Sequence, residues 1–397
     1  MGFVLFAALM LYFVFVCAPM QTAWGIWGLV ATELSFLVIA IVYGLIFRIP
    51  LKEMFPIKKF SARDLFGSIF LVIGGTLIGL ISVAVVGILI PSSVEGSDVE
   101  ALTDFIVDGP GYLLTMIILA LCPAICEEAI HRGAILSNFR TIRKDWVIVL
   151  IMAVFFGINH MSVLRFINTA ILGACLSYVV VKKNNILLSS IMHFTVNFSA
   201  STISYLSTVM LKSIAGGNFS GSDISSQFNS GSLRNVLGTY LMIGCIAPIL
   251  IVLGLMMLNP QGHKKIRFLF AGIIAAAMFV GSIGYTAYNT NANTLVQCSF
   301  NYTVTQDNSE SLPVDLDIEK DGDYNIVCVL MKGSGDYFVK IVDENGEVIY
   351  QEPFPEGSIR TYTSRKTFEA GYYELYIVNG KGTVGDMPAI SIQVNKA

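Results

Sequence analysis

The sequence predicts a polytopic α-helical membrane protein of about nine transmembrane helices, with a C-terminal all-β, sandwich-like extracytoplasmic domain. Three observations support this fold class. Of the 397 residues, 54% are hydrophobic and 13% are charged, roughly half the charged share usual in soluble domains. The mean hydropathy is +0.69, which is typical of chains that cross a bilayer repeatedly. Residues 289–397 hold 16 acidic and 8 basic residues, whereas the remainder is net basic.

Nine segments are long and apolar enough to cross a bilayer, since a spanning helix needs about 20 apolar residues. They cover about 2–19, 25–47, 65–91, 111–138, 146–163, 165–181, 186–211, 237–258 and 267–288. The first segment lacks the basic start of a signal peptide, so we expect it to remain as a helix. We expect four regions: N-terminal helices (1–99), a helical core (100–205), further helices with a polar outer loop (206–288) and the β-domain (289–397).

Basic residues are concentrated in four connections, and they predict the orientation of the chain. These connections are 47–63, 140–144, 182–183 and 263–267. The intervening loop 95–108 is acidic, and 213–233 is rich in Gly, Ser and Asn. Because Lys and Arg are enriched in cytoplasmic loops, we expect a cytoplasmic N-terminus and a C-terminal domain outside the cell.

The C-terminal region shows about eight short alternating runs bounded by Gly, Pro, Asp and Asn, the pattern of a β-sandwich. In 336–351, Asn345 and Gly346 separate two such runs, which predicts a hairpin with a two-residue turn. The acidic stretch 315–323 lacks the spacing of an EF-hand, so a solvated turn is preferred to a calcium site. The partner of this domain is unknown.

Cysteine usage indicates no metal-binding spacing. Five of the seven cysteines lie in apolar stretches and are expected to be small buried side chains. Cys298 and Cys328 lie in the C-terminal region, where a disulfide would be possible in an oxidising compartment. The sequence leaves that pairing open.

Three predicted spans contain polar side chains at bilayer depth. They are Glu127, Glu128, His131 and Arg132 in the fourth span, Asn159 and His160 in the fifth, and His193 and Asn197 in the seventh. A charge at bilayer depth costs about 2.5–3.5 kcal/mol on insertion scales. Convergence of these side chains on one interior site avoids that cost. A buried ion pair with separately packed histidines is the structural alternative.

Helical spacing assigns different surroundings to the two adjacent carboxylates. Residues four apart share a helix face, so Glu128 and Arg132 are predicted to form an ion pair. Glu127 lies about 100° further round the helix and turns to other neighbours. His193 and Asn197 share one face of the seventh span.

Glu, two His and an amide are sufficient for the activation of water and for stabilising an oxyanion. The same groups would otherwise hold a divalent metal such as zinc, with Glu127, His160 and His193 as ligands. The cofactor is therefore either none or a divalent metal, and an Asn in the set favours none. No GxSxG, HExxH or phosphate-binding loop is present, and nothing indicates a nucleic-acid partner.

The motifs "EEAIHR" (127–132), "FGINH" (156–160) and "HFTVN" (193–197) resemble the EExxxR, FxxxH and HxxxN motifs of the CPBP family. That family comprises CAAX proteases and bacteriocin-processing enzymes, including type II CAAX prenyl endopeptidases and Abi-type proteins, and is often described as metalloproteases. The resemblance covers about residues 100–205.

The resemblance implies an intramembrane endopeptidase acting on a membrane protein or peptide within the lipid bilayer, and we expect a bacterial cell membrane. Glu127 and His160 would activate water, and His193 and Asn197 would stabilise the oxyanion. Glu128 and Arg132 would orient the site. His131 receives no catalytic role and is expected near the inner interface.

Two other functions are compatible with the sequence. One is a non-catalytic family member that acts in bacteriocin self-immunity or as a membrane scaffold. The other is a proton-coupled transporter, because intramembrane Glu and His also serve proton relays. The sequence shows none of the inverted repeats expected of many transporters.

Overall fold

The computed structural model of the chain describes residues 1–94, 105, 111–215, 230–260, 266–333, 335–355 and 360–396. Contacts divide the chain into a helical unit, formed mainly by residues 1–205 and 228–283, and a second unit that contains residues 284–397. The predicted acidic loop, the Gly/Ser-rich loop and the basic connection at 263–267 lie largely outside the described residues.

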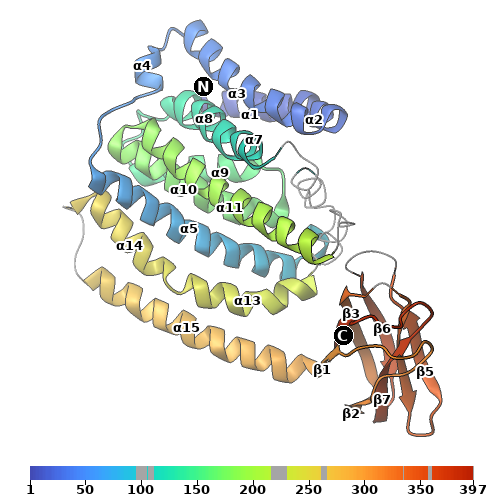
Figure 1. Cartoon of the computed structure of the whole chain (residues 1–397). Coiled ribbons are helices and arrows are strands. Elements are labelled where there is room, and N and C mark those ends of the chain that lie inside the picture. The colour runs from blue at the N-terminus through green and yellow to red at the C-terminus, as the bar shows by residue number, and fades with distance from the viewer. Residues whose placement is uncertain are drawn as a thin grey trace. The chain divides into compact units, whose positions relative to one another are not determined.

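The helical unit is built from a series of apolar helices (Figure 1). In chain order they are α1 (Gly2–Tyr12), η1 (Phe13–Cys17), α2 (Ala18–Trp24), α3 (Ile26–Ile46), α4 (Leu51–Met54), α5 (Ala62–Leu89), η2 (Pro91–Ser93), α7 (Tyr112–Met116), η3 (Ile117–Leu121), α8 (Cys122–Glu128), η4 (Ala129–Ile135), α9 (Asp145–Asn159), α10 (Val163–Lys183), α11 (Ile186–Ala215), α13 (Ser230–Gly244), α14 (Ala247–Leu258) and α15 (Ile266–Asn293). The chain is thus a polytopic helical membrane protein, as predicted.

The number of full spans differs from the nine predicted. Among the described residues, seven helices are long and apolar enough to cross a membrane, or eight if one bent pair is a single span. That pair, α13 and α14, bends by 41° next to Pro248, whose missing N–H cannot continue the helical hydrogen bonds. Helix α9 has only 15 residues, about 22 Å at 1.5 Å per residue, against a hydrocarbon core of about 30 Å.

The predicted fourth span continues past Arg132 as one helical span from Tyr112 to Ile135. Two stretches of it, η3 and η4, have π-helical hydrogen bonding. Pro123 lies between them, early in α8, and removes one backbone donor. Such π-helical turns are often found at functional sites, and η4 follows directly after Glu127 and Glu128.

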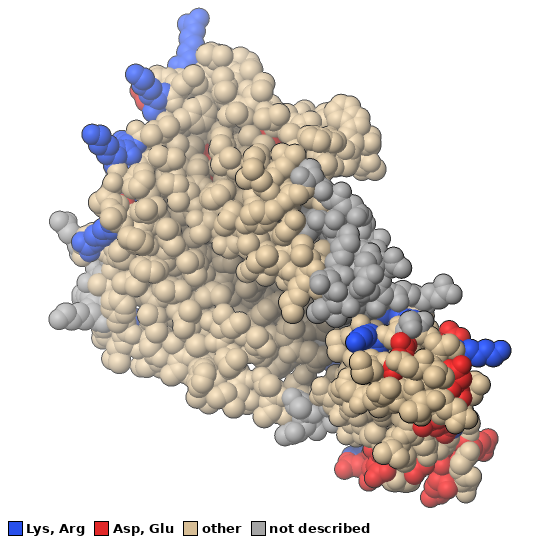
Figure 2. All heavy atoms as spheres, viewed as in Figure 1, with Lys and Arg blue, Asp and Glu red and all other residues tan. Residues whose placement is uncertain are grey.

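The second unit contains a β-sandwich of two four-stranded antiparallel sheets, as the alternating pattern predicted. Its strands are β1 (Thr294–Asn301), β2 (Val314–Ile318), β3 (Gly322–Lys332), β4 (Tyr337–Asp343), β5 (Val348–Pro353), β6 (Arg360–Phe368), β7 (Gly371–Asn379) and β8 (Ala389–Lys396). The order is β1-β8-β3-β6 in one sheet and β2-β7-β4-β5 in the other. Alternate residues of both sheets form one buried core, and Asp and Glu cover much of the visible surface (Figure 2).

The predicted β4–β5 hairpin is present, but its turn is longer than two residues. Asp343 donates its backbone N–H to the carbonyl of Glu347 at 3.0 Å, and three residues separate this pair. Gly346 has φ +80°, the left-handed conformation that closes three-residue turns. The Asp343 carboxylate accepts the N–H groups of Asn345 and Glu347, which stabilises the longer loop.

A disulfide between Cys298 and Cys328 is excluded by the strand order. Both residues pair with Ile392 of β8, one from each side, so two strand spacings separate them. This is about 9.5 Å, beyond the roughly 7 Å that a disulfide bridges between Cα atoms. None of the seven cysteines forms a disulfide, and the Cys298 thiol donates instead to the Ile392 carbonyl.

Asp307 closes a loop of the sandwich and provides a test of the domain's pH dependence. Its carboxylate accepts the backbone N–H groups of Gly382, Thr383 and Val384. These bonds lower the pKa of Asp307 below its usual 3.8. The loop is therefore stabilised above pH 3.8, and the stabilisation is lost as the pH falls through the lowered pKa of Asp307.

We expect Asp307→Asn to speed hydrogen exchange of the backbone amides of Gly382, Thr383 and Val384 at pH 7, relative to wild type. Equal protection factors for these amides in the variant and in wild type would contradict this role of Asp307.

Candidate active site

The interior of the helical unit contains a buried ion pair between Glu128 and Arg132. The Arg132 guanidinium donates to one Glu128 oxygen at 2.8 Å, and both side chains are 0% exposed. Because a desolvated charge without a partner is costly, this pair fixes both side chains along one turn of the helix. The spacing predicted this contact.

Glu128 also holds two groups from α11. His193 lies with its Nδ1 3.0 Å from the same Glu128 oxygen that Arg132 binds, and the Ser189 hydroxyl donates to the other oxygen. An ionised carboxylate only accepts hydrogen bonds, so His193 Nδ1 is the donor and its Nε2 remains for other contacts. Ser189 was not predicted, although it lies one helical turn before His193 on the same face.

Phe156 of α9 lies at the centre of the polar residues. The Arg132 guanidinium carbon is 4.3 Å from its ring centroid, a cation–π distance. The rings of His131, His160 and His193 all contact Phe156 edge to face, at 5.2, 4.9 and 5.7 Å between centroids. Phe156 therefore sets the spacing of the three histidines.

Gly173 of α10 allows this close packing. A Cβ at this position would lie 2.7 Å from the Cβ of Phe156, so only glycine lets α10 approach α9 here. The Gly173 carbonyl accepts a second hydrogen bond from Arg132, at 3.2 Å. The backbone of α10 thereby accepts a guanidinium N–H of Arg132 that does not bind Glu128.

Glu127 has different surroundings from Glu128. Its Oε2 is buried and has no hydrogen-bond partner. It interacts electrostatically with Glu33, a residue of α3, which packs against α8. Glu33 is 4% exposed, and its Oε2 also lacks a partner. Sequence reasoning missed Glu33, although it was visible as a lone acid within a predicted span.

His160 caps the C-terminal end of α9. Its Nδ1 lies 2.8 Å from the Phe156 carbonyl, and since a carbonyl only accepts, Nδ1 carries the proton. In the neutral ring, Nε2 is then an acceptor. His160 interacts electrostatically with Glu127, so the structure brings this predicted pair into one region without a direct hydrogen bond.

The remaining predicted residues are less closely linked. Asn197 lies one turn beyond His193 on α11, half-buried, and no hydrogen bond joins it to the other site residues within the described ranges. His131, expected near the inner interface, is 0% exposed, and both of its ring nitrogens lack partners. Asn159 is buried with an unpartnered Oδ1.

The arrangement does not fit the metal ligand set considered from the sequence. In the part of the chain that the structure describes, no three His, Cys, Asp or Glu side chains lie close enough to hold an ion. Glu127, His160 and His193 therefore do not converge as ligands, and His193 directs one nitrogen to Glu128.

Comparison with known proteins identifies one family. Residues 109–199 match the model of the family described as "Type II CAAX prenyl endopeptidase Rce1-like". No curated protein and no solved structure gives a significant match. The matched stretch contains the Glu128–Arg132 pair, α9 with His160, and the His193–Asn197 turn of α11. Residues 109–199, less than a quarter of the chain, are thus similar to a CAAX protease domain.

Proposed function

We propose that this protein hydrolyses peptide bonds of membrane proteins or peptides with a water molecule activated at Glu127. The match of residues 109–199 to the CAAX prenyl endopeptidase model supports this class of activity in general. The observation that supports the finer proposal is the contrast between the two adjacent carboxylates. Glu128 is saturated by Arg132, His193 and Ser189, whereas one buried oxygen of Glu127 has no partner.

That contrast assigns roles to both residues. A carboxylate that accepts three hydrogen bonds, one of them from a guanidinium, is a poor proton acceptor. Glu128 therefore positions His193 and does not act as the base. The unpartnered oxygen of Glu127 has a lone pair available for the proton of a water molecule. His160, with Nε2 as an acceptor, orients the same water.

The reaction follows from these positions. The water oxygen attacks the carbonyl carbon of the peptide bond while its proton passes to Glu127. His193 Nε2, when protonated, and the Asn197 amide donate hydrogen bonds to the oxyanion that develops. Glu127 then returns the proton to the amide nitrogen and the C–N bond breaks. The products are a carboxylic acid and an amine, and the acid then passes its proton to the amine or to water.

The proposal is tested by comparing membrane fragments from cells with the wild-type chain or Glu127→Gln. New peptide N-termini that appear only with the wild type would identify substrates. A matched control is Glu344→Gln, which makes the same change at an exposed position of the β-domain. Identical peptide patterns for wild type and Glu127→Gln would overturn the role proposed for Glu127. If cells without the chain also give that pattern, a non-catalytic immunity or scaffold role is favoured.

Glu33 is proposed to position Glu127 from the neighbouring helix. The two buried acids interact electrostatically from packed helices, and each has one oxygen without a hydrogen-bond partner. We expect Glu33→Gln to lower kcat by about ten- to a hundredfold with KM changed less than threefold, because the site keeps its shape. Glu33→Asp should recover part of the loss. A change in KM alone would indicate that Glu33 contacts substrate instead.

A further inference from the structure

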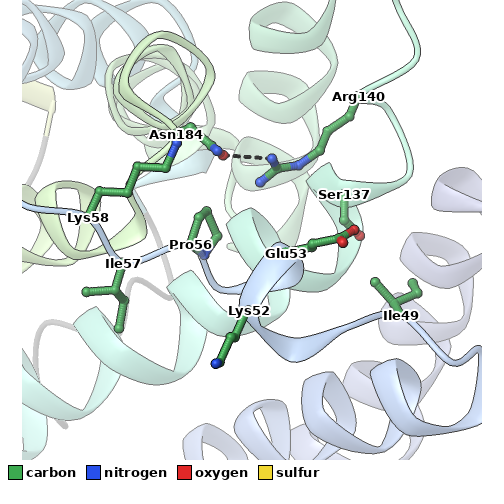
Figure 3. A pocket seen from close by; sticks show the side chains of 9 residues that line it. All are labelled: Ile49, Lys52, Glu53, Pro56, Ile57, Lys58, Ser137, Arg140 and Asn184. Atoms are coloured by element: carbon green, nitrogen blue, oxygen red, sulfur yellow. Dashed lines mark hydrogen bonds between the residues drawn. The ribbon is translucent and has the colours of Figure 1, made fainter.

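A cavity of about 290 Å³ opens in the helical unit (Figure 3), and Glu127 is not among the residues that line it. It lies between the segment that follows α3 and the turns that follow η4 and α10. The lining residues are Ile49, Lys52, Glu53, Pro56, Ile57, Lys58, Ser137, Arg140 and Asn184. Its volume is near the lower end of the range for small-molecule pockets, about 300–1,000 Å³.

The cavity carries an excess of positive charge. Lys52, Lys58 and Arg140 contribute three cations against the single carboxylate of Glu53. The Arg140 guanidinium is held in place by the Asn184 side chain, which accepts its hydrogen bond at 2.7 Å. An arginine that is already oriented and keeps further N–H donors is suited to bind a phosphate, which accepts paired hydrogen bonds.

The walls of the cavity are fixed by the backbone. Asn185, 1% exposed, donates its side-chain amide to the Lys58 carbonyl at 2.7 Å. The N–H of Ile186 donates to the Pro56 carbonyl at 2.8 Å. These two bonds join the segment 56–58 to the start of α11. They hold these walls of the cavity in place, so binding would need little reorganisation.

The position of the cavity places it at the level of lipid headgroups. Helix α3 ends at Ile46 and α10 at Lys183, so the lining residues lie just beyond the ends of two spans. The exposed Lys and Arg of the helical unit gather on this side (Figure 2), which the charge pattern predicts to be cytoplasmic. Ile57 beside Lys58 is 70% exposed and offers an apolar surface next to the charges.

We propose that this cavity binds the phosphate of an anionic lipid headgroup. Lys58 and Arg140 pair with the phosphate oxygens, and Ile57 contacts the start of an acyl chain. A soluble phosphate would use the same two cations but would gain nothing from Ile57. Basic pockets between helix ends on the cytoplasmic side are suited to such headgroups. The proposal does not depend on the catalytic role of Glu127.

The test measures binding to the full-length protein in neutral detergent by native mass spectrometry. Three probes separate the sources of phosphate: phosphatidylglycerol, phosphatidylcholine and soluble glycerol phosphate. We expect phosphatidylglycerol to bind at least tenfold more tightly than either of the others. Comparable binding of phosphatidylcholine would overturn the charge selectivity, and comparable binding of glycerol phosphate would overturn the lipid assignment.

Charge-neutral variants locate the site. Arg140→Gln is expected to weaken phosphatidylglycerol binding about tenfold, the loss typical of one charge-assisted hydrogen bond. Lys58→Gln should also weaken phosphatidylglycerol binding. Within the described residues, the Lys58 side chain makes no hydrogen bond or ion pair that this substitution would remove. Arg143→Gln removes an exposed charge from the same connection without touching the cavity and should change binding less than threefold. Equal losses for Arg140→Gln and Arg143→Gln would show diffuse surface attraction and refute the site.

Discussion

Replacing Glu127 with Gln is expected to lower the rate of peptide-bond cleavage by a factor of about 10²–10⁴, the range that a general base contributes. The amide of Gln matches the carboxylate in size but is a far weaker base. Because one buried Glu127 oxygen has no hydrogen-bond partner, the substitution removes no known contact of that atom. The measurement is the rate constant for cleavage of a substrate reconstituted in vesicles with the purified protein.

The control for this experiment is the thermal midpoint of the same preparation. We expect the midpoint of Glu127→Gln to equal or exceed that of wild type, since an unpaired buried acid is removed. A loss of cleavage accompanied by a fall in the midpoint would attribute the effect to folding. Full retention of cleavage would show that another group, such as Glu33, is the base.

Replacing Arg132 with Leu is expected to destabilise the helical unit by about 3–5 kcal/mol, the usual cost of removing one partner of a buried ion pair. Glu128 would stay fully buried without its counter-ion, and the contacts of Arg132 to Gly173 and Phe156 would be lost. The measurement is the midpoint of unfolding in a denaturing detergent, with Arg143→Leu as an exposed control.

A second substitution distinguishes lost charge balance from lost packing. Adding Glu128→Gln to Arg132→Leu removes the unpaired carboxylate, so part of the stability should return. We expect a coupling of about 0.5–3 kcal/mol between the two positions. If the stability losses of Glu128→Gln and Arg132→Leu simply add, the pair contributes little electrostatic energy. The arginine then acts through its packing on Phe156.

Some of the site follows from sequence spacing because it lies on one helix. Glu128 and Arg132 pair as the four-residue interval predicts, and His193 and Asn197 share a turn of α11. The partners that join separate helices were missed. Ser189 binds Glu128 across 61 positions of the chain, and Glu33 approaches Glu127 from α3. Only the packing of the helices specifies such pairs.

The fold was predictable to the level of segments. All nine apolar segments are helical, and the alternating pattern of the C-terminal region gives the eight strands. Composition did not reveal that α13 and α14 bend at Pro248 or that α9 stops at Asn159. The hydrogen bond between Asp343 and Glu347 decides the length of the β4–β5 turn. The Asn345-Gly346 pair predicts a turn but does not specify this hydrogen bond.

The shortness of α9 has a consequence for how water is supplied to the reaction. With 15 residues, the helix covers about 22 Å. It is therefore roughly 8 Å shorter than the thickness of a typical hydrocarbon core. A bilayer responds to a short helix by thinning next to it. His160 caps the end of α9, so a thinned bilayer beside α9 would bring the aqueous phase closer to the residues proposed to orient water. If the proposed reaction occurs there, we expect its rate to depend on bilayer thickness.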